Sequence, residues 1–298
     1  MRYHDIYSRH VSVKLLDLTC CHLVESLHVT HRFFSGCPLS TDFLAEMVAP
    51  VIGLQNETVN ETVESSTVVQ TQRNLDINIV YLISSKILMG VESSTDNSTP
   101  IFASFEDVLV EAEKSDNQSL LGYVYTAVVQ LKVIFGEYEA AATATVEAGD
   151  IRAGLFGNFT GIRFTFLAAL AYLKAAQSSD TRERRRWKKK GLKELKLVRS
   201  WTKKGNVNLE HCLHLLEAEL AVAERRKSTY IEGRYKSAIE TAKTNGFLQD
   251  QALSNELASL YFAGQGDVLR RDGYMKDAID CYSEWGAVAK VDQLTKRK

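Results

Sequence analysis

The sequence predicts an all-α protein, an α-solenoid built of stacked antiparallel helix hairpins. Apolar residues recur at helical spacing along nearly the whole chain, and no convincing run of alternating strand residues interrupts them. Only three of the 298 residues are proline, and none follows Pro100, so long helices are permitted beyond that point. Short connections, several of them with glycine, separate the helices, which is typical of antiparallel neighbours.

The first part of the chain predicts helical hairpins over residues 1–55. An apolar-periodic run over 6–34 ends at a Gly/Pro turn, and a second helix follows Asp42, a residue type that suits an N-cap. Residues 56–74 are rich in Thr, Ser, Asn and Glu and lack aromatic residues, so we expect a flexible polar loop there.

Residues 75–298 predict a continuous region of helical repeats that forms one superhelix with residues 1–55. A helix is expected over 75–88 and a polar loop over 90–100, after which the helical pattern is dense. The further helices are predicted over 104–113, 119–135, 138–148, 159–176, 181–203, 209–225, 230–244, 248–263, 273–285 and 287–295.

Composition limits the class of protein. Hydrophobic residues make up 45% of the chain and charged residues 24%, which excludes a wholly disordered protein. A net charge of −1 argues against a global nucleic-acid footprint. Five scattered cysteines predict free thiols in a reducing compartment. The first residues lack an apolar signal segment, and the apolar stretch 164–173 is too short to cross a bilayer, so we expect a cytoplasmic protein.

Helix-turn-helix units recur, most clearly at residues 136–141. Gly136 ends one helix, Tyr138 opens the next, and the small Ala141 allows close helix packing. This arrangement is typical of a tetratricopeptide hairpin. Weaker copies lie at 218–238 and 258–282, without a strict period. The residues that we expect to pack the repeats are Gly136, Tyr138, Ala141, Tyr235, Ala238, Ala258, Tyr282 and Trp285.

The carboxy-terminal part carries a family resemblance. Asn245-Gly246-Phe247, Gln251-Ala252-Leu253, Asn255-Glu256-Leu257-Ala258, Cys281-Tyr282 and Trp285-Gly286-Ala287 follow one another in a specific order. They resemble the tetratricopeptide-like helical region of large signalling proteins. Those proteins combine a serine/threonine-kinase-like domain, an AAA- or STAND-type ATPase, and a GAF/histidine-kinase or nucleotide-cyclase output.

The resemblance implies a sensor or regulatory region rather than an enzyme. It is strong over about 209–294 and looser upstream, at residues 33–39 and 135–141. The turn at 264–266 is about one residue longer than usual, and Gly273 stands where alanine is common. The kinase, ATPase and output domains of the family are absent from this chain.

No motif predicts catalysis or a bound cofactor. The chain lacks a phosphate-binding loop and kinase signatures, and its paired carboxylates lie apart from any His or Ser nucleophile arrangement. His28 and His31 share a helical face, as do His211 and His214, but no Cys-x-x-Cys accompanies them. We therefore predict no metal site and no cofactor, and we expect His211 on the surface of a helix.

The basic run 182–204 is the strongest local charge feature. It contains many Lys and Arg residues, two Trp residues, and an apolar stripe at Leu192, Leu195 and Val198. Such a helix either binds an anionic partner or forms a solvated outer face with its tryptophans turned inward. The candidate anionic-partner face comprises Arg184, Arg185, Arg186, Lys188, Lys189 and Lys190.

The sequence therefore predicts a non-catalytic protein-interaction or regulatory module. The expected partner is a protein or peptide on the concave face, or a neighbouring domain of a longer polypeptide. One alternative is a binder of an acidic protein, RNA or membrane through residues 182–204, although nucleic acid and membrane surfaces are the less favoured partners. The other alternative is a fragment of a signal-transduction kinase or nucleotide-cyclase polypeptide.

Overall fold

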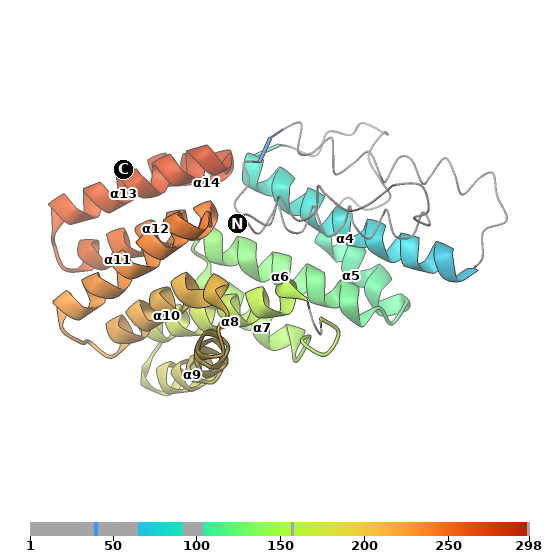
Figure 1. Ribbon diagram of the computed structural model, residues 1–298, viewed down its shortest axis with the longest axis horizontal. Helices are drawn as coiled ribbons and strands as arrows, with labels where there is room; N and C mark the ends of the chain where they lie inside the picture. Colours follow the sequence, from blue (N-terminus) through green and yellow to red (C-terminus); the bar gives the residue numbers. More distant parts are fainter. Residues whose placement is uncertain (1–38, 41–64, 92–103, 156–157, 297–298) are drawn as a thin grey trace.

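The computed structural model describes residues 39–40, 65–91, 104–155 and 158–296 (Figure 1). All regular structure in these ranges is helical, which confirms the all-α prediction. The helices are α4 (Ser65–Met89), α5 (Phe105–Lys114), α6 (Gln118–Ile134), α7 (Tyr138–Ala148), α8 (Phe159–Ser178), α9 (Thr181–Lys203), the 3-10 helix η1 (Val207–Leu209), α10 (Glu210–Ala223), α11 (Ser228–Asn245), α12 (Leu248–Gly264), α13 (Val268–Trp285) and α14 (Val288–Lys296).

Neighbouring helices in the chain pack pairwise: α6 with α7, α8 with α9, α10 with α11, and α12 with α13. The first members of these pairs also pack in succession, α4 on α6, α6 on α8, α8 on α10 and α10 on α12. At the far end α14 returns to contact α4, and the two lie near each other in Figure 1. The backbone N–H of Leu39 donates to the carbonyl of Trp285 at 2.6 Å, beside this contact.

One turn geometry recurs at the ends of the helices. At eight helix ends in the described ranges, a residue with positive φ is followed by an N–H that donates to the carbonyl five residues earlier. This 6→1 bond is the mark of a Schellman cap, in which the left-handed position favours glycine. Glycine occupies six of the eight positions, and Asp116 and Arg225 occupy the other two.

Most of the core is contributed by the first helix of each pair. Fifteen residues of α8 are buried, including a run from Phe164 to Leu173. By length and composition α8 could cross a membrane, but 83% of the relevant window is buried inside the protein, as expected for a core helix. Small residues of α8 allow its neighbours to approach, because alanine and glycine leave little side chain between two helix axes.

Two helices differ from their predicted bounds by more than two residues. Residues 65–74, predicted as part of a flexible polar loop, form the first turns of α4. No proline or glycine lies between Ser65 and Met89, so a helix packed at residues 77–89 can propagate backward through polar residues at small cost. Helix α13 begins at Val268 rather than 273, because Asp267 accepts from the N–H of Arg270 (3.1 Å) and caps it. The predicted hairpins of residues 1–55 lie outside the described residues, apart from 39–40.

Candidate functional site

The basic segment forms a single helix, α9, with the bounds that the sequence predicted. Asp180 caps its N-terminus by accepting from the N–H groups of Arg182 (2.9 Å) and Glu183 (3.0 Å). Its buried side consists of Trp187, Gly191, Leu195 and Val198. A Cβ on Gly191 would lie 3.0 Å from the Leu173 side chain, so the glycine permits close approach of α8.

Aromatic packing fixes the rotation of α9 about its axis. The Trp187 ring stacks on Tyr172 with centroids 5.6 Å apart and an angle of 15°. The Arg186 guanidinium lies over the Trp187 ring at 5.0 Å, and the Lys190 ammonium lies over Tyr172 at 5.5 Å. Burial, followed by the charge of Glu194, raises the pKa of the Tyr172 hydroxyl to about 12. The inward tryptophan leaves the opposite side of α9 to solvent.

The side of α9 opposite its buried residues carries cations and Ser200, and the exposed Thr181, Glu183, Leu192 and Arg199 lie beside this side. At about 100° per residue, the exposed basic residues other than Arg199, which pairs with Glu217 at 3.0 Å, fall within an arc of about 100° along the whole helix, roughly 35 Å. None of them forms an ion pair among the residues that the structure describes, and no carboxylate lies within the arc. We call these residues the cationic stripe: Arg182, Arg185, Arg186, Lys189, Lys193, Lys196, Lys203 and Lys204.

The structure divides the six predicted anionic-partner residues into two groups. Arg185, Arg186 and Lys189 lie on the cationic stripe. The other three are half-buried on the flanks of the helix: Arg184, Lys190 over Tyr172, and Lys188, which pairs with Glu224 at 3.0 Å.

The remaining five members of the stripe were not among the predicted residues. They could have been found by projecting residues 181–204 on a helical wheel, because the buried Trp187 and Leu195 identify the inward side.

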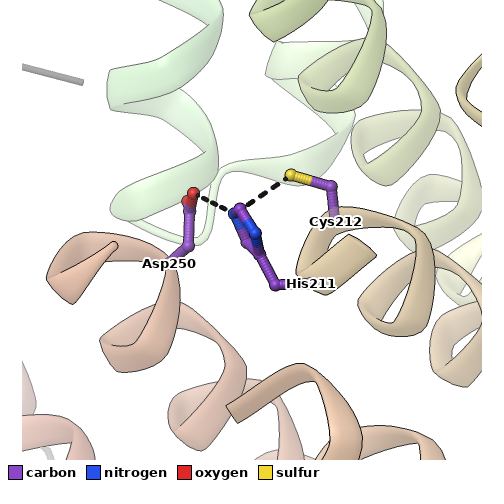
Figure 2. A group of neighbouring side chains, drawn as sticks. All are labelled: His211, Cys212 and Asp250. Atoms are coloured by element: carbon purple, nitrogen blue, oxygen red, sulfur yellow. Dashed lines mark hydrogen bonds and ion pairs between the residues drawn. The ribbon is translucent and has the colours of Figure 1, made fainter. Parts of the chain in front are cut away.

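A buried polar cluster joins α6, α8, α10 and α12. The Arg163 guanidinium donates through one nitrogen to both oxygens of Asp250, each at 2.7 Å, and through Nε to Gln130 at 3.2 Å. His211 Nε2 lies 2.9 Å from Asp250 Oδ2 and 3.3 Å from Cys212 Sγ (Figure 2). His211 therefore lies in the core. The prediction that it lies on the surface of a helix is wrong. Its ring stacks on Phe247 at 4.4 Å.

The charges in this cluster stabilise one another. Burial alone disfavours the charged forms of His211 and Asp250. For His211 the charge of the Cys212 sulfur and the hydrogen bond that His211 donates to Asp250 outweigh burial and raise the pKa to about 10. For Asp250 the adjacent Arg163 charge and the His211 hydrogen bond outweigh burial and lower the pKa of the carboxyl. The cluster thus favours an ionised Asp250 between two cations.

The same cluster contains ligand types that can hold a metal. The candidate ligand atoms of His211, Cys212 and Asp250 all lie within 4.8 Å of one another, and a soft cation such as Zn²⁺ accepts this donor set. Both Asp250 oxygens, however, already accept from the Arg163 guanidinium. Because Arg163 places a fixed positive charge at the site where a cation would bind, the geometry favours a buried ion network.

Two further buried carboxylates link pairs of helices. Glu219 of α10 accepts from the Tyr235 hydroxyl at 2.6 Å and from Gln177 at 2.8 Å, and Lys174 lies 3.3 Å from it. Glu256 of α12 accepts from Tyr282 at 2.9 Å.

The second of these networks reaches the last helix. Lys290 of α14 donates to Glu256 at 2.7 Å and to Gln293 at 3.0 Å, and Gln293 in turn donates to the Phe135 carbonyl at 3.1 Å. These hydrogen bonds link α12, α14 and the end of α6.

The predicted repeat-packing residues lie at helix contacts. Gly136 ends α6 with φ +79°, and the Lys174 ammonium lies 5.3 Å from the centroid of the Tyr138 ring. Gly136 and Tyr138 are partly exposed. The other six are buried: Ala141, Tyr235, Ala238, Ala258, Tyr282 and Trp285.

Comparison with known proteins adds no relative: no protein-family model, no curated protein and no solved structure matches this chain. The proposals that follow therefore rest on the residues and on the geometry described above.

Proposed function

We propose that the chain is a tetratricopeptide-like α-solenoid that acts as a non-catalytic interaction module, and that it docks an acidic segment of a protein partner on the cationic stripe of α9. The observation that carries this proposal is the stripe itself. Seven cations of α9 and its C-cap Lys204 share one exposed side, and none of the eight forms an ion pair within the described residues. Helix α9 contains eleven Lys or Arg residues against two Glu, in a chain whose net charge is −1.

The charge balance favours a protein partner. Residues outside α9 are net acidic, and this charge repels phosphate-rich surfaces at long range. A short acidic segment can meet the cationic stripe alone and thereby avoid this repulsion. In the resembled family such a segment would belong to a partner or to a neighbouring domain of a longer polypeptide.

The packing of α9 disfavours the other anionic partners. Its apolar residues Trp187, Leu195 and Val198 face the core, and the exposed Leu192 stands beside charged residues, so the helix has no continuous apolar face to insert into a bilayer. Single-stranded RNA binding commonly uses exposed aromatic rings on which bases stack. Trp187 is buried, and Trp201 is partly buried against the core.

Polar side chains link helices that belong to different hairpins. Arg163 of α8 reaches Asp250 of α12, and Gln293 of α14 reaches the end of α6. That a peptide occupies a concave face stays a prediction. The alternative of a kinase or cyclase fragment rests on the resemblance, and sequencing the transcript beyond both ends of this reading frame tests it.

The docking proposal is tested with matched charge reversals. The stripe variant changes Arg185, Lys189 and Lys196 to Glu. The control variant changes to Glu three exposed lysines that form no ion pair among the described residues: Lys114, Lys243 and Lys276. Binding of a labelled poly-glutamate peptide is followed by fluorescence anisotropy at increasing salt. We expect the stripe variant to lose at least about tenfold in affinity, the control to stay close to the native protein, and salt to weaken native binding.

Two results would contradict the docking proposal. One is the absence of peptide binding at low ionic strength. The other is an equal loss of affinity in both variants, which would indicate a non-specific response to net charge. Parallel titrations with duplex RNA and with phosphatidylserine vesicles test the alternative partners, and tighter binding of either would replace the acidic protein segment as the proposed partner.

A further inference from the structure

A pocket of about 450 Å³ opens where the ends of α8, α10 and α12 meet the start of α11. Apolar walls come from Val222, Ile231, Leu260 and the Tyr261 ring, and Lys174 and Arg225 supply positive charge. No carboxylate lines it. Leu260 is 40% exposed although it faces a cavity, so an apolar surface is available to a ligand there.

Arg225 occupies a backbone position that glycine usually fills. Its φ is +54°, in the left-handed region, and the following N–H of Arg226 donates to the Ala221 carbonyl at 2.9 Å. Six of the eight helix ends with this geometry use glycine. An arginine side chain makes the left-handed conformation costly. A residue held in an unfavourable conformation beside a cavity points to a role for its side chain.

The charge of Arg225 is available to a ligand, whereas the neighbouring charges are already paired. Lys174 lies 3.3 Å from Glu219. Arg226, the next residue in the turn, pairs with Glu224 at 2.9 Å. The Arg225 guanidinium makes no ion pair within the described part of the chain. Its guanidinium N–H groups are therefore available to a ligand in the pocket.

We propose that this pocket binds an organic carboxylate attached to an apolar or aromatic body. The guanidinium fork of Arg225 matches a carboxylate in geometry and charge. The body of the ligand packs on Leu260, Val222 and the Tyr261 ring. A free small acid and the carboxyl terminus of a short peptide share this chemistry. The pocket is separate from the cationic stripe, so the proposal does not depend on docking at α9.

The test uses two acids and their neutral amides as probes: phenylbutyrate, and the peptide acetyl-Ala-Ala-Phe with a free carboxyl terminus. Binding to the full chain is measured by calorimetry and by ligand-observed NMR. We expect at least one acid to bind and its amide to bind at least tenfold more weakly. Which of the two acids binds more tightly identifies the source of the carboxylate.

Variants locate the binding. Arg225→Gly removes the guanidinium and relieves the backbone, so it is expected to lose at least tenfold in affinity without a lower melting temperature. Arg225→Lys keeps the charge and is expected to retain weaker binding, and Lys276→Ala, on α13 outside the pocket, is expected to bind like the native chain. The proposal is overturned if neither acid binds at millimolar concentration, if an amide binds as well as its acid, or if Arg225→Gly binds unchanged.

Discussion

At the scale of single residues, the buried carboxylates are the most informative feature of this protein. Asp250, Glu219 and Glu256 are each at most 1% exposed, and an unpaired charge in such a position would be very costly. Each carboxylate instead accepts from two or more side chains of other helices. The helices are therefore joined by specific hydrogen bonds as well as by apolar packing.

The first prediction concerns Asp250. Asp250→Ala leaves Arg163 and His211 buried without their shared anion, and it should lower the free energy of unfolding by about 3–5 kcal/mol. Urea unfolding followed by circular dichroism measures the change. The control is Asp277→Ala, which removes an exposed carboxylate from α13 and should change stability by less than about 0.5 kcal/mol. Equal stabilities of the two variants would show that the cluster does not hold the helices.

The second prediction concerns pH. The pKa of His211 is about 10 in the folded chain, whereas an unperturbed histidine has a pKa of 6.5. Its stabilising contribution is therefore complete below about 6.5 and is lost as pH rises through about 10, with a slope of at most about 1.4 kcal/mol per pH unit. The free energy of unfolding, measured across this range, should fall in the native protein. His211→Gln should lack this component, and identical profiles would refute the assignment.

At the scale of helices and turns, the repeated left-handed cap sets the connections. Gly246 ends α11 with φ +78°, and a Cβ there would meet nothing within 4 Å. A side chain at this position would therefore cause no steric overlap, and its only cost would be the left-handed backbone conformation. Gly136, Gly205 and Gly266 are equally open and are explained by backbone freedom in the same way, whereas a Cβ at Gly286 would also overlap the Leu39 carbonyl oxygen.

The third prediction follows from this cap. Gly246→Ala should lower the free energy of unfolding by about 1 kcal/mol. Gly233, in the middle of α11, has ordinary helical φ and equally open surroundings, so Gly233→Ala should raise stability by about the same amount. Arg225→Gly should also raise it, by up to about 1 kcal/mol. Thermal and urea unfolding of the three variants measures these differences, and a stabilised Gly246→Ala would contradict the account.

At the scale of the whole molecule, the contact between α4 and α14 brings distant parts of the chain together. Trp285, at the end of α13, is fully buried, and its carbonyl accepts from Leu39. Lys290 and Gln293 extend this region to Glu256 and to the end of α6. The last two helices therefore complete a core that begins far upstream in the sequence.

The fourth prediction tests this arrangement. Trp285→Ala should lower the free energy of unfolding by about 3–5 kcal/mol, because it removes a large, fully buried side chain and leaves a cavity. Leu269→Ala in the same helix is the control, since Leu269 is 86% exposed and its truncation should be nearly neutral. The melting temperatures of both variants are measured by calorimetry. An unchanged melting temperature for Trp285→Ala would show that this side chain does not contribute to the core.

Local patterns determined the helices and most of their ends. The bounds of α7 and α9 follow from sequence, because helix formation and capping depend on neighbours within a few residues. Val198 and Leu195 could be placed on an apolar stripe for the same reason. Helix α4 began earlier than predicted, because packing of its later turns supports polar residues that would not form a helix alone.

Tertiary structure alone decided the burial of polar residues and the grouping of the sites. Arg163 and Asp250 are 87 residues apart, and no local pattern relates them. His211 was predicted on the surface because histidine beside glutamate is locally compatible with solvent, yet Asp250 and Phe247 surround it. Sequence determined which segments are helical through short-range hydrogen bonding and apolar periodicity. Only long-range packing could decide which charges pair in the core and which, as on α9 and at Arg225, stay free.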